Sequence, residues 1–189
     1  MNEDVDFGAA IKVGWEGFTR KPVELIVGWS LAFLSSLLLV TAGAAILGMV
    51  KQALGAVRGE EITIGTAFEG YENFVSGLVL SILLVVVMTL GFMACILPGI
   101  ALAVMLQWTF YCAVDDQELG AVDAMKESWE MAKSNIAAPI IAMLIGFGLS
   151  MLGGFVPFGF VITAPLSLVI TAAIYDSARR IRSGQTPAI

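Results

Sequence analysis

The chain has 189 residues, of which 58% are apolar and only 14% are charged, and its formal net charge is −6. Soluble domains carry about 45–50% apolar and about 25% charged residues, so this composition indicates a membrane protein. The acidic balance lacks the basic footprint of nucleic-acid binding, and the absence of histidine removes the commonest general base and metal ligand.

Long charge-free stretches predict an all-α bundle of transmembrane helices. The stretches cover residues 25–50, 73–114 and 134–175. A helix needs about 20 apolar residues to cross the hydrocarbon core, and the second and third stretches are each about twice that length. We therefore expect two spans in each, within one transmembrane domain over residues 1–189.

The N-terminal region predicts an amphipathic helix over 7–20 that lies in the membrane interface, because apolar residues that include Trp15 recur there at helical spacing. Pro22 suits the first turn of a new helix, and residues 23–57 are expected to form a first helical hairpin. The long, late apolar stretch does not fit a cleavable signal peptide.

Lys51 is the charge that this first hairpin would place at membrane depth. A lysine in lipid costs roughly 2.5–3.5 kcal/mol on insertion scales. Its side chain is therefore expected either to snorkel to the interface or to face the bundle interior, where an ionisable group is a functional candidate.

The next segments predict a polar loop over 59–73 and a central hairpin over 74–114. Pro98 and Gly99 interrupt the apolar block, and they predict its turn because proline lacks the amide proton and glycine tolerates the reversal. Cys95 and Cys112 are interpreted as small buried hydrophobes.

A second interfacial helix is expected over 117–134, with Trp129 on its apolar face. The acidic residues at its start have two interpretations. They either complement the positive end of a helix that begins at Asp115 and Asp116, or bind a divalent cation. A third hairpin over 137–175, broken near Gly153, and a cytoplasmic tail over 177–189 complete the chain.

A weak internal repeat relates the two ends of the chain at an offset of 114 residues, where Ala-x-Lys and Trp-Glu recur. The same offset aligns two stripes with a small residue at every fourth position, which allows helix backbones to approach closely in a membrane. We expect both stripes to be buried helix contacts facing one another: Gly28, Ala32 and Ser36, and Ala142, Gly146 and Ser150.

Several motifs resemble an uncharacterised family of multi-pass prokaryotic membrane proteins. They are the Ile-Leu-Pro-Gly-Ile run around Pro98 and an A-x-x-x-S-x-x-x-x-K-x-N pattern. The residues that fill this pattern are Ala124, Ser128, Lys133 and Asn135. The family is related to the membrane domain of some glycerophosphodiester phosphodiesterases. Their catalytic domain needs histidines and metal-binding acids, so the resemblance implies a fold and no reaction.

Topology and function follow from the grouping of charge. Three hairpins, six segments in all, place every charged residue on one side, which the positive-inside rule makes cytoplasmic together with both termini. The alternative has five spans, with residues 23–50 crossing once and the N-terminus outside. We expect a multi-pass protein of the inner (cytoplasmic) membrane.

No G-x-S-x-G motif surrounds Ser128 or Ser150, and no residue pattern predicts catalysis, a cofactor or a metal. The preferred hypothesis is a non-catalytic protein that organises the membrane or binds lipid, a protein partner or a second copy of itself. The alternative is a small transporter or channel for an apolar or lipid-like solute, since many transporters contain internal repeats.

Overall fold

The computed structural model describes the backbone of residues 7–36, 41–155 and 158–185 and, except at 32–36, their side chains. All regular elements in these ranges are helical, which confirms the all-α prediction. The helices are α1 (Phe7–Arg20), α2 (Pro22–Ser36), α3 (Ala42–Arg58), the 3-10 helix η1 (Gly65–Asn73), α4 (Phe74–Ala94), α5 (Ile96–Leu106), α6 (Thr109–Asp115), α7 (Ala121–Ser134), α8 (Ala137–Gly154) and α9 (Phe160–Arg182).

Four helical stretches in the described ranges are long and apolar enough to cross a membrane. They are Gly65–Ala94, which joins η1 to α4, Ile96–Asp115, which joins α5 to α6, and the helices α8 and α9. The helices of the expected first hairpin are shorter within the described ranges, where α2 covers 15 residues and α3 covers 17. The structure therefore supports a membrane location with four candidate spans, fewer than the six predicted segments.

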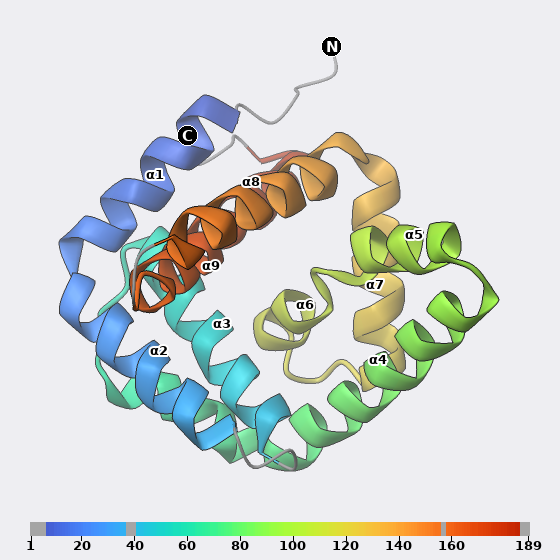
Figure 1. Ribbon diagram of the computed structural model, residues 1–189, viewed down its shortest axis with the longest axis horizontal. Helices are drawn as coiled ribbons and strands as arrows, with labels where there is room; N and C mark the ends of the chain where they lie inside the picture. The colour runs from blue at the N-terminus through green and yellow to red at the C-terminus, as the bar shows by residue number, and fades with distance from the viewer. Residues whose placement is uncertain (1–6, 37–40, 156–157, 186–189) are drawn as a thin grey trace.

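Figure 1 shows α3 and α6 enclosed by the other helices, with α1 and α2 on one side and α7 on the other. The core lies around α3, α6 and α9. Trp108 is fully buried between α5 and α6, and its ring packs edge-to-face against Tyr175 of α9 at a centroid separation of 5.9 Å. The ring centroid of Tyr111 in α6 lies 5.3 Å from the ring centroid of Tyr175. Aromatic packing therefore holds α6 and the residue just before it against α9.

The outer helices expose continuous apolar faces. On α4 and α8, exposed side chains recur every three or four residues: Val75, Val79, Ile82 and Val86, and Ile140, Leu144, Phe147 and Met151. Soluble monomers rarely expose apolar patches of more than a few hundred square ångströms. Contact with lipid explains how these faces can be apolar although they do not pack against another part of the described chain.

Glycines bring α3 very close to its neighbours. A Cβ atom on Gly43 would collide with the backbone carbonyl of Gly77 in α4, and one on Gly48 would collide with the carbonyl of Ala67 in η1. Only a residue without a side chain permits this approach. Gly43 and Gly48 both lie inside α3.

The central block departs from its predicted boundaries. The break after α4 is at Cys95, whose backbone is extended, and Pro98 and Gly99 lie in the first turn of α5. Proline suits that position because the first amides of a helix have no intrahelical acceptor. The stretch predicted as a loop contains η1, and α9 continues to Arg182, so residues 177–182 are helical and not a tail.

The helices α1 and α7 match at the offset of the sequence repeat. Each has 14 residues, and their bounds differ by the same 114 positions. Their buried residues also correspond one to one: Ala10, Gly14, Gly17 and Phe18 in α1, and Ala124, Ser128, Met131 and Ala132 in α7. The two helices thus bury the same face, on opposite sides of the molecule (Figure 1).

Candidate functional site

The ends of three helices meet at a network of paired charges. Arg58, the last residue of α3, donates from Nη1 and Nη2 to the two carboxylate oxygens of Asp115 in α6, at 2.6 and 3.0 Å. Its Nε donates to Oδ1 of Asp176 in α9 at 2.9 Å. The Nε of Arg180 donates to Oδ2 of Asp176 at 2.8 Å, and Arg179 donates to Asp115.

The two carboxylates are almost fully enclosed. The side chain of Asp115 is 3% exposed and that of Asp176 is 5% exposed, whereas Arg58 is 24% exposed. A buried carboxylate is costly unless it is both paired and hydrogen-bonded. The hydroxyl of Tyr175 supplies a further hydrogen bond to Asp115 at 3.0 Å, so each oxygen of that carboxylate accepts from at least one donor.

The charges on this network reinforce one another. Burial lowers the pKa of the Arg58 guanidinium. The hydrogen bonds and negative charges of Asp115 and Asp176 together raise this pKa by more than burial lowers it, so the pKa lies above its usual range. Arg58 therefore stays protonated and serves as a permanent cation that joins α3 to α6 and α9.

The prediction that Asp115 begins a helix is wrong. Asp115 is the last residue of α6, and α7 begins only at Ala121. A carboxylate at a helix C-terminus is disfavoured by the helix dipole, so the surrounding arginines must compensate for it. Among the described residues, no group of three acidic or thiol side chains is arranged to hold a metal ion.

An open pocket of about 380 Å³ lies beside the network. Its lining is polar and comes mainly from the last turns of α9, together with the end of α3: Arg58, Asp176, Arg179, Arg180, Ser183 and Gln185. The three arginines outnumber the single carboxylate in this lining. The pocket is therefore suited to an anion.

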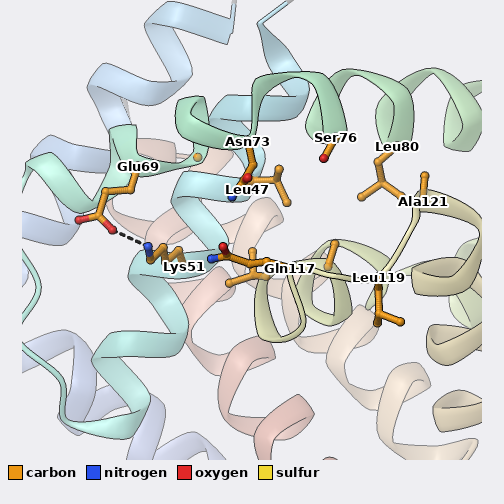
Figure 2. Close-up of a pocket in the computed structure, with 12 residues that line it drawn as sticks. Leu47, Lys51, Glu69, Asn73, Ser76, Leu80, Gln117, Leu119 and Ala121 are labelled. Carbon is orange, nitrogen blue, oxygen red and sulfur yellow. Dashed lines mark ion pairs between the residues drawn. The ribbon is translucent and has the colours of Figure 1, made fainter.

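Lys51 lies at a second, much smaller pocket. Its Nζ is 2.5 Å from a carboxylate oxygen of Glu69 in η1, and both side chains are more than a third exposed. Figure 2 shows this ion pair at one side of a pocket whose walls include Leu80 and Gln117. The cavity measures about 40 Å³, which is room for water, since one water needs about 10–15 Å³ of such volume.

The small-residue stripes divide between different partners. A Cβ atom on Gly28 would lie 2.5 Å from Nε2 of the buried Gln52 in α3, and one on Gly146 would lie 3.0 Å from Oγ of Ser167 in α9. The stripes therefore contact α3 and α9 at these positions and not one another. Ser150 is exposed and donates to the carbonyl of Gly146, so its predicted burial is wrong. The side chains of Ala32 and Ser36 lie outside the described residues.

The residues of the resembling helix pattern have structural contacts in α7. Ser128 is fully buried and donates to the carbonyl of Met105 in α5 at 2.9 Å. Asn135 accepts a hydrogen bond from the amide of Ala138 at the start of α8. Lys133 forms an exposed ion pair with Glu130 at 3.0 Å. The first two contacts join α7 to α5 and to the start of α8, and the ion pair lies within α7.

The two tryptophans of the interfacial helices have different surroundings. Trp15 is 54% exposed and stacks on Phe18 of the same helix, whereas Trp129 is partly buried. A large exposed aromatic beside polar residues is typical of the membrane–water interface.

Sequence reasoning missed Arg58, Asp176 and Arg179 as site residues. Their signal was their position, since Asp115 and Asp176 are the first charged residues after the two longest charge-free stretches. Charges at the ends of apolar spans lie near a membrane surface, outside the hydrocarbon core. The spacing of Asp176 and Arg180 in one helix was also readable as an i,i+4 pair.

Comparison with known proteins gives a family without an assigned activity. A family model described as "Domain of unknown function (DUF7847)" matches residues 59–182. The uncharacterized protein Rv2560 of Mycobacterium tuberculosis is 28% identical over 139 residues, which cover 73% of this chain and 41% of that protein. The uncharacterized protein Mb2590 of Mycobacterium bovis is 27% identical over 139 residues, which again cover 73% of this chain and 41% of that protein. This chain thus spans 41% of the length of these curated relatives. No solved structure matches.

Proposed function

The chain belongs to the family described as "Domain of unknown function (DUF7847)", and from that premise we propose that it is a non-catalytic, multi-pass membrane protein whose charged face binds lipid or a protein partner. The carrying observation is the charge network of Arg58, Asp115 and Asp176. It gathers cations and carboxylates at the boundary of the apolar helices, where they are in reach of headgroups and of proteins at the membrane surface.

The arrangement of the helices supports a binding role more than transport. The pocket at Lys51 has a volume of about 40 Å³, too small for a lipid-like solute. The core between α3, α6 and α9 is filled by aromatic rings, among them Trp108 and Tyr175. A transporter needs a path or a site near the midplane that such packing closes.

In the proposed topology, the chain lies in the inner membrane and both of its termini are in the cytoplasm. The paired ends of α3, α6 and α9 support it, because they bring basic residues from distant parts of the chain to one side. The matching burial of α1 and α7 supports a duplicated unit, with both helices lying in the interface on that side.

The experiment combines retention with flux. The chain is extracted in a mild uncharged detergent, and lipids and proteins that stay bound at fixed stoichiometry are identified by mass spectrometry. The same preparation is reconstituted into liposomes loaded with an apolar fluorescent solute. Retention of a lipid, a protein or a second copy with no release above protein-free liposomes supports the proposal.

The alternative is a transporter or channel for an apolar or lipid-like solute, which the matching α1 and α7 units favour, since repeats are common in transporters. Release that increases with the amount of reconstituted protein would establish this alternative and overturn the binding role. The control for release is an α1 variant, Gly14→Leu. A Cβ atom at this position would already lie 3.0 Å from the backbone of Ile170, so a larger side chain disrupts the packing of α1 against α9.

A further inference from the structure

The polar pocket at the end of α9 has the chemistry of an anion site. We propose that the pocket lined by Arg58, Arg179 and Arg180 binds a phosphate group with net negative charge, supplied by an anionic phospholipid headgroup or by free phosphate. The proposal rests on the binding function proposed above and names its ligand.

The charge balance of the network leaves one cation over. Three guanidinium groups face two buried carboxylates, and both carboxylates are already occupied. Asp115 accepts from Arg58, Arg179 and Tyr175, and Asp176 accepts from Arg58 and Arg180. One guanidinium charge therefore has no counter-charge among the two carboxylates of the network.

The donors that remain are on the two outer arginines. Within the described residues, the hydrogen bonds of Arg180 use Nε and those of Arg179 use Nη1. Their side chains are 36% and 46% exposed, so the other guanidinium donors are accessible to a ligand. Arginine binds phosphate through paired N–H groups in a fixed plane, which gives strong, charge-assisted hydrogen bonds.

The rest of the lining favours a phosphate and opposes a cation. Ser183 and Gln185 are neutral, and the single acidic member, Asp176, is neutralised by two arginines. The volume of about 380 Å³ is sufficient for a phosphate with part of a headgroup. An anion here would meet three positive groups and no unpaired carboxylate of the lining.

The depth of the pocket fits the phosphate layer of a membrane. Asp115 directly follows the charge-free residues 73–114, and Asp176 directly follows 134–175. The network is therefore at the boundary between the apolar faces and water, which is where phospholipid phosphates lie. Basic pockets between membrane helices on the cytoplasmic side bind anionic headgroups. The net charge of −6 gives no general attraction, so binding depends on this local site.

The test uses the full chain in an uncharged detergent and measures the midpoint of thermal unfolding. Three ligands are titrated: short-chain phosphatidylglycerol, short-chain phosphatidylcholine and inorganic phosphate. A ligand that binds the folded state raises the midpoint with concentration. Arg180→Gln is the test variant, and Arg182→Gln is the matched control, because Arg182 lies on the same helix but pairs with Glu127 outside the pocket.

We expect phosphatidylglycerol to raise the midpoint of the wild type and of Arg182→Gln, with the half-effective concentration about tenfold higher in Arg180→Gln. An Arg180-dependent rise with phosphatidylglycerol alone identifies a lipid headgroup, and an equal rise with inorganic phosphate identifies the free anion. A second variant, Gln185→Glu, places a negative charge at an exposed lining position outside the network and is expected to weaken binding similarly.

The proposal is overturned if both Arg180→Gln and Gln185→Glu respond as the wild type does, or if phosphatidylcholine acts as strongly as phosphatidylglycerol on the wild type. These outcomes are separate from the proposed function, which also covers a protein partner retained after extraction. Solute release from liposomes would overturn the proposed binding role. It would not account for an unfolding midpoint that depends on ligand and on Arg180.

Discussion

Arg58 and Asp115 form a two-pronged ion pair between residues 57 positions apart, with N–O distances of 2.6 and 3.0 Å. The pair joins the last residue of α3 to the last residue of α6, so it connects a helix of the N-terminal half to the central block. Because Asp115 is buried, removing one partner of this pair costs more than removing one partner of an exposed pair in the same chain.

Asp115→Asn is expected to destabilise the folded chain by about 3 kcal/mol, because it removes one of the two carboxylates that pair with the largely buried Arg58 and the carboxylate that pairs with Arg179. The free energy of unfolding in detergent, from denaturant titration, measures the effect. Asp123→Asn is the control, since its partner Lys126 and its own side chain are more than half exposed, and it should change stability by less than about 0.5 kcal/mol. Equal effects of the two substitutions would contradict the burial of Asp115.

Gly48→Ala is expected to destabilise the protein by about 1–3 kcal/mol, because the new methyl group collides with the backbone carbonyl of Ala67 in η1. Gly148→Ala in α8 is the matched control. A Cβ atom there meets nothing within 4 Å, so the higher helix propensity of alanine should stabilise the chain by up to about 1 kcal/mol. Thermal unfolding midpoints compare the two, and a Gly48→Ala midpoint at or above that of Gly148→Ala would refute the close packing of α3.

Gly28→Ala is expected to displace Gln52, whose Nε2 would lie 2.5 Å from the added Cβ atom. That amide donates to the carbonyls of Glu24 and Thr63, at 2.8 and 3.2 Å, and loses these bonds when it moves. A loss of about 1–3 kcal/mol follows for buried donors left unpaired. Gly146→Ala, which meets only a serine hydroxyl at 3.0 Å, should cost less. The order of their unfolding midpoints is the measurement, and the reverse order would be inconsistent with this packing.

The two cysteines are expected to react differently and never to pair. Cys95 is exposed between α4 and α5, and Cys112 is buried in α6. A small maleimide added to the detergent-solubilised chain should modify Cys95 within minutes and Cys112 only after unfolding, because burial blocks access to the thiol. Mass spectrometry of the peptides reads both sites. A disulfide between them under oxidising conditions would show that α4 and α6 are placed differently.

Reporter cysteines at Asn2 and Gln185, in a chain without its own cysteines, are expected to react with an impermeant reagent from the cytoplasmic side only. The reason is the excess of basic residues around the charge network, which the positive-inside rule assigns to the cytoplasm. Inverted and right-side-out vesicles give the two accessible faces. Labelling of Asn2 from outside would replace this topology with the five-span alternative.

Local periodicity predicted much of the helical framework. The apolar spacing that begins at Phe7 predicted a helix over 7–20, the range of α1, and the recurrence at the same offset pointed to α7. Such signals are local, since each helix needs only its own apolar face. Pro98 was less informative, because a proline fits both a turn and the first turn of a helix, and the structure has the second.

The charge network could not be predicted in the same way. Arg58 and Asp176 are 118 positions apart, and no local pattern relates them. Their contact depends on how α3 packs against α9, which is decided by small residues and aromatic rings distributed over several helices. The 3-10 helix η1 also depends on packing between distant residues, since Gly70 lies directly against the backbone of Ala44 and Gly48 in α3.

The distance along the chain between Arg58 and Asp176 also sets an order of events during biosynthesis. A ribosome makes Arg58 long before it makes Asp176, and the network gains this carboxylate only when α9 has been made and has packed against α3. Until then the chain lacks Asp176, a partner of Arg58, and also lacks the helix that packs against α1, α3 and α8. A chain that ends before α9 therefore lacks both one of the two carboxylates that pair with Arg58 and the helix that carries it.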